Sequence, residues 1–171
     1  MNLPNILSLT RLLLSPLMLF LEFYEAITLF IFLSITDAID GYIARKFKQE
    51  TNLGIVLDPI ADKILLLTAL YVFTYKFHIV PSSLLFFLLL RDGLILLGGI
   101  HMFLTKRIIP KSRPLGKLTT AYICVAIPLV VLFKVETMLY IGYSFILLSF
   151  LDYLMVYVRV INSKAEFTPN P

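Results

Sequence analysis

The sequence has little charge, one cysteine, two histidines and no tryptophan. Charged residues make up 15% of its 171 residues and hydrophobic residues 59%, whereas soluble domains carry about 25% charged residues. This deficit argues against an ordinary soluble domain. Cys124 is the only cysteine, so an internal disulfide is excluded and a cysteine-based metal site is disfavoured. Because His78 and His101 are far apart in the sequence, any bound metal would have to be held by oxygen ligands.

Long apolar runs fill much of the remaining sequence, for example LILLGGIHMFL and AYICVAIPLVVLF. About 20 apolar residues are enough for a helix to cross the hydrocarbon core of a bilayer. The N-terminal stretch has no basic leader and no small-residue cleavage site, so we interpret it as a membrane helix, not a signal peptide. We predict an all-α, polytopic membrane protein with one domain over residues 1–171. Its six transmembrane helices are expected at about residues 4–23, 27–47, 52–76, 81–104, 116–134 and 137–161.

Basic residues gather in two of the segments that connect the predicted helices. Such segments face the cytoplasm under the positive-inside rule, which places both termini on that side as well. The even number of predicted helices agrees with this orientation. The basic segments contain Arg45, Lys46 and Lys48 after the second helix and Lys106, Arg107, Lys111 and Arg113 after the fourth, while the alternate segments have Lys76 and Lys134.

Four aspartates lie within the apolar helical sequence DAIDGYIARKFKQETNLGIVLDPIAD. Asp37 and Asp40 are three residues apart and share a helix face, and Asp58 and Asp62 share a face at a spacing of four. The segment at 48–52 is short, which makes the two helices antiparallel neighbours. We therefore expect the two carboxylate pairs to face each other near the cytoplasmic end of these helices.

Four ionised carboxylates in one membrane-embedded cluster need cations beside them. A single Asp in the middle of a membrane helix costs roughly 2.5–3.5 kcal/mol on insertion scales, and close carboxylates repel each other. Arg45 and Lys63 do not balance four negative charges. Two Mg²⁺ or Mn²⁺ ions about 3.5–4 Å apart would, because these ions prefer carboxylate oxygens and such a pair suits phosphoryl chemistry. Gly41 and Gly54 on the same faces either admit a ligand close to the backbone or allow tight helix packing.

The spacing of these residues resembles the signature of the CDP-alcohol phosphatidyltransferase family. All eight fixed positions of that signature are filled. The N-terminal stretch NILSLTR resembles the short Asn/Thr/Arg element of the family, with Ser8 where Thr is frequent. Length and helix number fit too, so the resemblance covers nearly the whole chain. The eight positions are Asp37, Asp40, Gly41, Ala44 and Arg45, then, after eight residues, Gly54, Asp58 and Asp62.

The resemblance implies an enzyme that displaces CMP from a CDP-linked lipid, usually CDP-diacylglycerol, with the hydroxyl of a small alcohol. It implies that Asp37, Asp40, Asp58 and Asp62 bind two Mg²⁺ or Mn²⁺ ions and that Asp62 is also the general base. It further implies a homodimer in a membrane, most simply a bacterial inner membrane, with the active site on the cytoplasmic side and no nucleic-acid partner. The implied nucleotide-binding residues are Asn5, Arg11, Gly41, Ala44, Arg45 and Gly54.

The identity of the acceptor alcohol depends on basic residues outside the signature. Arg91 lies within an apolar run and forms either an intramembrane ion pair or part of a phosphate site. Arg113 and Lys117 flank a predicted helix N-terminus, where the helix dipole favours an anion, although basic residues there also contact anionic lipids. A basic pocket favours glycerol 3-phosphate, the acceptor of the phosphatidylglycerophosphate synthases of this family. Phosphatidylglycerol, the acceptor of its cardiolipin synthases, and an inositol phosphate are the alternatives.

Two further questions remain open from the sequence. A divalent-cation transporter is the main non-enzyme alternative, because intramembrane carboxylates also mark ion pathways. The acids cluster at one end, however, and no inverted repeat is visible. Asp152 is a lone acid in the last predicted helix, where it either pairs with Arg159 or faces a partner subunit.

Overall fold

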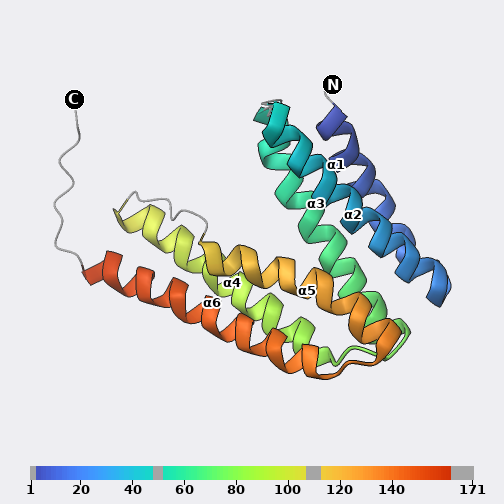
Figure 1. Cartoon of the computed structure of the whole chain (residues 1–171). Helices are drawn as coiled ribbons and strands as arrows, with labels where there is room; N and C mark the ends of the chain where they lie inside the picture. Colours follow the sequence, from blue (N-terminus) through green and yellow to red (C-terminus); the bar gives the residue numbers. More distant parts are fainter. Residues whose placement is uncertain (1–2, 48–51, 107–112, 163–171) are drawn as a thin grey trace. The chain divides into compact units, whose positions relative to one another are not determined.

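The computed structural model describes the backbone of residues 3–47, 52–106 and 113–162 (Figure 1). Within these ranges it describes every side chain except those of residues 3–6, 38, 40–47, 52–56 and 106. No strand occurs in this part of the chain, so the all-α prediction is confirmed. The helices are α1 (Leu3–Leu14), η1 (Ser15–Leu19), α2 (Phe23–Phe47), α3 (Asn52–Tyr71), η2 (Val72–Lys76), α4 (Ser82–Lys106), α5 (Pro114–Phe133) and α6 (Thr137–Asn162).

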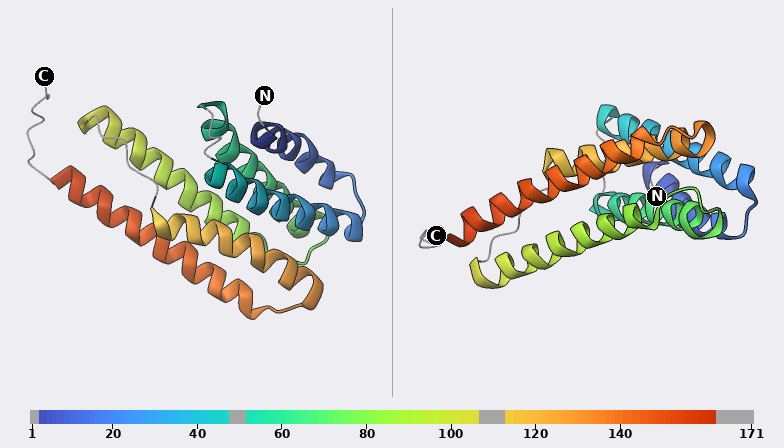
Figure 2. Two further views of the ribbon diagram at one scale, coloured as in Figure 1. Left: turned by 45° about the horizontal axis from the view of Figure 1, so that its top comes forward. Right: turned by 90° about the horizontal axis from the view of Figure 1, so that it is seen from below.

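The chain divides into two compact units. Unit 1 comprises residues 1–85 and 127–135, and unit 2 comprises residues 86–126 and 136–171. In unit 1, α1, α2 and α3 pack against one another (Figures 1 and 2). Their core contains fully buried Phe30, Leu70 and Phe73. The prediction of a single domain over the whole chain stays a prediction.

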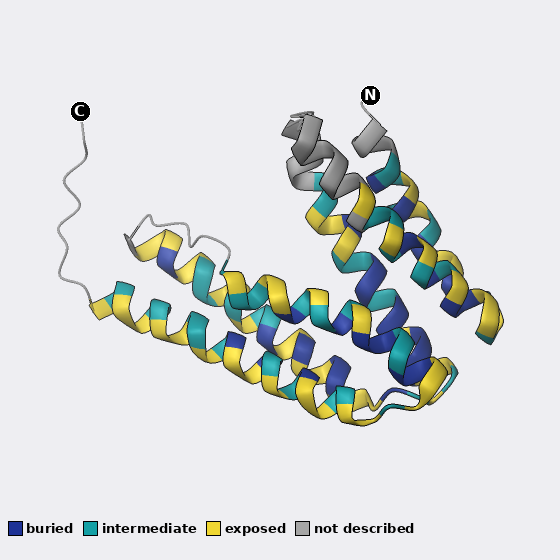
Figure 3. Ribbon diagram, in the orientation of Figure 1, coloured by how far each residue is buried: buried dark blue, intermediate teal, exposed yellow. Residues whose placement is uncertain are grey.

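The buried face that runs along α1 and η1 is unusual because it is mostly polar. Ser8, Arg11, Ser15 and Met18 are buried and are spaced by three or four residues, which places them on one face of a helix. Buried polar groups need hydrogen-bond or ionic partners. This face therefore directs α1 toward polar side chains of its neighbours, and Figure 3 shows buried positions along it.

The first predicted helix, 4–23, ends early. The α-helical part stops at Leu14 and continues as the 3₁₀ turn η1 to Leu19. Pro16 lies at the start of η1, and its missing N–H and its ring disfavour an uninterrupted α-helix through this position. The chain then restarts at Phe23 as α2, four residues earlier than the predicted start. The interruption of the α-helix at this proline is thus the physical reason for the difference.

The third predicted helix, 52–76, consists of two parts. The α-helix α3 ends at Tyr71, and the π-helical turn η2 completes the segment to Lys76. After it, His78 adopts a positive φ of 55°, and the backbone N–H of Val80 donates to the carbonyl of Phe73. This left-handed residue ends the segment in the manner of a helix C-terminal cap.

In unit 2, α5 and α6 are antiparallel neighbours joined by polar and aromatic contacts (Figure 2). The Thr119 hydroxyl donates to the carbonyl of Phe145 (3.2 Å), and the Tyr122 hydroxyl donates to the carbonyl of Met138 (3.0 Å). The rings of Tyr122 and Phe145 stack at a centroid distance of 4.9 Å. These contacts fix the register of the two helices along their length.

Three helices in the described part are long and apolar enough to cross a membrane by length and composition. They are Ser82–Thr105, Pro114–Phe133 and Thr137–Asn162. Large apolar side chains remain exposed on them, for example Leu96, Val125 and Met155. Many exposed large apolar side chains on long helices are typical of contact with lipid. The structure therefore supports a membrane protein.

Candidate active site

Three helices of unit 1 direct charged side chains to one point. The buried guanidinium of Arg11, on α1, lies 2.7 Å from the Asp37 carboxylate of α2. The same guanidinium pairs with the Asp62 carboxylate of α3. Arg11 is 1% exposed, whereas Asp37 and Asp62 are 39% and 47% exposed. A buried cation thus faces two accessible carboxylates, as expected for a polar cluster that can meet a ligand from solvent.

Ser8 extends this cluster by one helical turn. Its hydroxyl donates to the Asp58 carboxylate, one turn before Asp62 on α3. Ser8 and Arg11 are three residues apart, and Asp58 and Asp62 four, so one face of α1 meets one face of α3 with matching spacing. Through Ser8 and Arg11, this face of α1 contacts Asp37, Asp58 and Asp62.

The fourth predicted aspartate, Asp40, falls among residues whose side chains lie outside the described part. The same holds for Asn5, Gly41, Ala44, Arg45 and Gly54, so these predictions are neither supported nor contradicted. Within the described part, no three acids, histidines or cysteines form a group that could hold a metal. The donor chemistry nevertheless fits a hard divalent cation, because carboxylate oxygens of α2 and α3 already converge on a positive charge.

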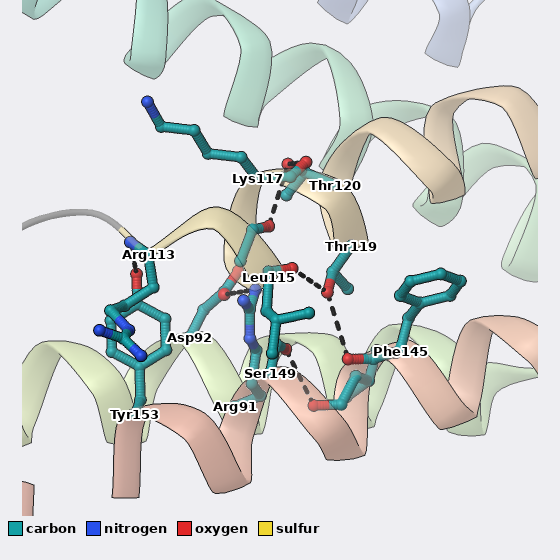
Figure 4. A network of polar contacts seen from close by, with 12 residues as sticks. Arg91, Asp92, Arg113, Leu115, Lys117, Thr119, Thr120, Phe145, Ser149 and Tyr153 are labelled. Carbon is teal, nitrogen blue, oxygen red and sulfur yellow. Dashed lines mark hydrogen bonds and ion pairs between the residues drawn. The ribbon is translucent and has the colours of Figure 1, made fainter. Parts of the chain in front are cut away.

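A second polar cluster lies in unit 2, around the first turn of α5 (Figure 4). Arg91, on α4, is 95% buried, since only 5% of it is exposed. Its Nη1 donates to the Asp92 carboxylate at 2.8 Å. Its Nε is buried and has no hydrogen-bond partner among the described atoms. Arg91 thus forms an ion pair and also has one buried donor without a partner among the described atoms, so its part in a phosphate site stays a prediction.

Arg113 is fixed by two consecutive residues of α6. Its Nε and Nη2 donate to the two oxygens of Asp152 at 2.8 and 2.5 Å, a bidentate pair. Its backbone N–H donates to the Tyr153 hydroxyl at 3.0 Å (Figure 4). The Asp152 carboxylate raises the pKa of the Arg113 guanidinium above its already high value. Asp152 thus pairs with Arg113, and Arg159, one of its two predicted alternatives, is not this partner.

Gly116 lets these side chains approach the backbone of α5. A Cβ at this position would lie 3.0 Å from Nη2 of Arg91 and 3.2 and 3.3 Å from the ring and hydroxyl of Tyr153. Such separations are shorter than ordinary van der Waals contact. Lys117, the next residue, is exposed. All three predicted phosphate ligands, Arg91, Arg113 and Lys117, therefore lie at the N-terminal end of α5. Arg91 is paired with Asp92, and Arg113 with Asp152.

A cavity of about 350 Å³ lies beside this cluster, between α4 and α6. Its lining is mostly apolar, with Leu94, Phe150 and Leu154 among the residues, and Arg113 and Tyr153 belong to its polar part. His101 and Tyr157 also line it and are joined by a hydrogen bond of 3.0 Å. The cavity therefore combines an apolar interior with a cationic group at its wall.

Sequence reasoning did not assign four residues of these clusters: Ser8, Asp92, Gly116 and Tyr153. For Ser8 a signal existed, because Ser8, Arg11 and Ser15 recur with helical spacing. For Asp92 its adjacency to Arg91 was visible. Tyr153 contacts Arg113, and Gly116 lies against Arg91, only because α4, α5 and α6 pack together. Nothing in the local sequence distinguishes Tyr153 from the other eight of the nine tyrosines.

The chain is similar to known proteins over most of its length. The sequence model of the CDP-alcohol phosphatidyltransferase family matches residues 1–161. A CDP-diacylglycerol--glycerol-3-phosphate 3-phosphatidyltransferase of Aquifex aeolicus is 38% identical over 132 residues, which is 74% of this chain and 74% of the relative. An enzyme of the same name from Cereibacter sphaeroides is 37% identical over 140 residues, covering 77% of this chain and 63% of the relative.

Cardiolipin synthases are also similar to the chain. The human cardiolipin synthase (CMP-forming) is 36% identical over 121 residues, which is 68% of this chain and 39% of that protein. The family match extends over nearly all of the chain and includes the segment of α1, α2 and α3 in which Ser8, Arg11 and the aspartates meet. The chain belongs to the CDP-alcohol phosphatidyltransferase family.

Proposed function

We propose that this protein transfers the phosphatidyl group of CDP-diacylglycerol to glycerol 3-phosphate and releases CMP, a step of phospholipid biosynthesis. The observation that supports it most is the meeting of Asp37, Asp58 and Asp62 with Arg11 and Ser8 in unit 1. The relatives that bear this activity in their names match about three quarters of the chain. Membership in a family of transferases argues against the cation-transporter alternative.

Divalent cations are the expected cofactors, since the family uses them. Asp37, Asp40, Asp58 and Asp62 would hold two Mg²⁺ or Mn²⁺ ions, which would neutralise the phosphates of the donor and the charge of the departing CMP. The carboxylates of Asp37 and Asp62 already contact a cation, the Arg11 guanidinium. Arg11 balances these acids, and we retain its predicted part in the nucleotide site as part of the proposal.

Asp62 is proposed as the general base. The acceptor hydroxyl loses its proton to the Asp62 carboxylate as its oxygen bonds to the phosphatidyl phosphorus, and the bond from that phosphorus to the CMP oxygen breaks. A base must be within hydrogen-bond reach of the hydroxyl, and the accessible Asp62 side chain, at 47% exposure, satisfies the first condition for that contact. Asn5, Gly41, Ala44, Arg45 and Gly54 are proposed to shape the nucleotide site.

The phosphate of the acceptor is proposed to bind Arg91, Arg113 and Lys117. These residues surround the N-terminus of a 20-residue helix, whose dipole and unsatisfied N–H groups favour an anion. Arg113 has five N–H donors on its guanidinium, and the pair with Asp152 uses only some of them. The Nε of Arg91, buried without a partner among the described atoms, is a further donor.

An acceptor screen tests the proposal. Purified protein with CDP-diacylglycerol and Mg²⁺ or Mn²⁺ is assayed for CMP release with glycerol 3-phosphate, phosphatidylglycerol, an inositol phosphate and serine in turn. We expect release with glycerol 3-phosphate and loss of release when the metal is chelated. Absence of CMP release with every acceptor would refute the enzyme assignment, and release with a different acceptor only would replace glycerol 3-phosphate.

One observation favours a second candidate, cardiolipin synthesis from phosphatidylglycerol. The apolar cavity of about 350 Å³ beside Arg113 and Tyr153 would suit an acyl chain of a lipid acceptor, whereas glycerol 3-phosphate has none. Relatives named cardiolipin synthase match over about two thirds of the chain. The screen separates the two candidates directly, because phosphatidylglycerol and glycerol 3-phosphate are offered separately.

We also propose that all six predicted helices span the membrane, with both termini and the active site on the cytoplasmic side of a bacterial inner membrane. The three apolar helices α4, α5 and α6 and the distribution of basic residues support this arrangement. Assembly as a homodimer stays a prediction from the family resemblance.

A further inference from the structure

Tyr153 is the residue at which the second cluster converges. Its hydroxyl accepts the backbone N–H of Arg113 at 3.0 Å, and its ring and hydroxyl lie against Gly116. Pro114, between these two residues, has no N–H of its own. The Tyr153 contact therefore fixes the chain immediately before α5 begins, and it is made by the backbone of the residue whose guanidinium is paired with Asp152.

Gly116 leaves the space that the guanidinium of Arg91 occupies. The Nη2 of Arg91 lies 3.0 Å from the point that a Cβ on residue 116 would occupy, and Tyr153 atoms lie 3.2 and 3.3 Å from the same point. A side chain at this position would have to push both groups away. Gly116 thus lets a buried guanidinium, a tyrosine and the first turn of α5 meet closely, and the buried Nε of Arg91 lacks a partner within the described structure.

The charges of this cluster suit an anion. Arg91 and Arg113 are each paired with an acid, so Lys117 and the N-terminus of α5, with roughly half a positive charge, leave the cluster net positive. Arg113 is 41% exposed despite its bidentate pair, so its guanidinium is still accessible. The geometry of both arginines, more than their number, then decides how well a phosphate is bound, because guanidinium donors are fixed in direction.

We propose that Tyr153 and Gly116 are positioning residues that hold Arg113 and Arg91 in the orientation needed to bind the acceptor's phosphate. This inference rests on the proposed function, since it concerns the acceptor site of that reaction. Tyr153 acts through the backbone of Arg113, and Gly116 acts by leaving room for Arg91 and Tyr153. Neither residue needs to touch the acceptor.

Two substitutions with matched controls test the inference. Tyr153→Phe removes only the hydroxyl, and Tyr122→Phe removes another tyrosine hydroxyl that is hydrogen-bonded to the backbone, outside the cavity and this cluster. Gly116→Ala adds a Cβ into the cluster, and Gly93→Ala adds the same Cβ on α4 where nothing lies within 4 Å. For each variant, the helix content and the elution profile are compared with those of the wild type to confirm that the protein is folded.

The first measurement is calorimetric binding of glycerol 3-phosphate to the detergent-solubilised protein without the donor lipid. Loss of one neutral hydrogen bond corresponds to about a fivefold weaker affinity. We expect Kd to rise at least about fivefold in Tyr153→Phe and Gly116→Ala and to stay within twofold of wild type in Tyr122→Phe and Gly93→Ala. Unchanged Kd in both test variants, or no binding by the wild type, overturns the inference.

The second measurement separates positioning from a general structural defect. In the CMP-release assay, KM for glycerol 3-phosphate should rise in the two test variants in parallel with Kd, while kcat and KM for CDP-diacylglycerol stay near wild type. A fall in kcat with unchanged KM for glycerol 3-phosphate contradicts the inference. Absence of turnover by the wild type with glycerol 3-phosphate refutes the proposed function instead, and the binding experiment then still decides whether these residues position an anion site.

Discussion

Arg11 is the residue that links the three helices of unit 1. Its side chain is almost fully buried, yet it is paired with the more accessible carboxylates of Asp37 and Asp62. Burying a charge without a partner is costly, so the arginine and the aspartates depend on one another for stability. Because the carboxylates of Asp37 and Asp62 share one guanidinium, substituting either aspartate leaves Arg11 with the other as its anionic partner. A single substitution can therefore change the reaction without leaving a buried charge unpaired.

At the residue scale we predict that Asp62→Asn abolishes turnover without unfolding the protein. The amide is nearly isosteric but cannot accept the proton of the acceptor hydroxyl, and a general base typically contributes about 10²–10⁴-fold to the rate. Asp37 continues to balance Arg11. CMP release and thermal denaturation in detergent provide the two measurements. The same change at the exposed Glu136, Glu136→Gln, serves as a control, and substantial turnover by Asp62→Asn would remove the base assignment.

The sequence predicted the acids of this site better than their partners. Asp37, Asp58 and Asp62 could be grouped because helical spacing sets the face on which each lies. The contacts of Ser8 with Asp58 and of Arg113 with Asp152 join residues 50 and 39 positions apart. Such pairs depend on how helices pack, which spacing within one helix does not encode. For this reason the sequence left two possible partners for Asp152, Arg159 or a partner subunit, and neither is the observed partner, Arg113.

At the element scale, the early end of α1 and the turn η2 belong to one arrangement in unit 1. Lys76, the last residue of η2, donates its ammonium to the carbonyls of Leu19 and Leu21 at 3.1 and 2.6 Å. Leu19 is the last residue of η1 and Leu21 follows it, and Pro16 in η1 has already interrupted the α-helix. The last carbonyls of a helix lack partners within it, so a lysine from elsewhere in the chain satisfies them. Composition predicted an apolar helix through 4–23, and this long-range cap could not be read from it.

We predict that Lys76→Met lowers the stability of the protein modestly. The substitution keeps the length of the side chain and removes two hydrogen bonds to carbonyls at an exposed site, a loss of roughly 0.5–1.5 kcal/mol. The melting temperature in detergent, compared with that of Lys134→Met as an exposed-lysine control, measures the effect. Equal melting temperatures for the two variants would show that the contact of Lys76 with Leu19 and Leu21 does not contribute. CMP release at low temperature should remain near wild type in both.

At the scale of the whole molecule, the apolar composition is realised as helices with exposed apolar faces. Helices α4, α5 and α6 meet the length and composition of membrane spans, and at a rise of about 1.5 Å per residue a 20-residue helix covers the roughly 30 Å of hydrocarbon. The helices could be predicted because the apolar pattern that indicates a helix lies within the sequence of each segment. Which side of the membrane each end faces depends on the basic residues between helices, a property of the chain in its membrane.

The predicted orientation can be tested by cysteine labelling. Cys124 is the only cysteine, so Cys124→Ala gives a cysteine-free background. Into it, Thr105→Cys, exposed near the end of α4, and Glu136→Cys, exposed between α5 and α6, are introduced one at a time. The positive-inside rule places the first position at the cytoplasmic face and the second at the opposite face. A membrane-impermeant maleimide should therefore label Glu136→Cys in intact spheroplasts and Thr105→Cys only in inverted vesicles. The reverse pattern would invert the topology and put the basic segments, and with them Arg113 and Lys117, on the outer side, where a cytoplasmic phosphorylated acceptor could not reach them.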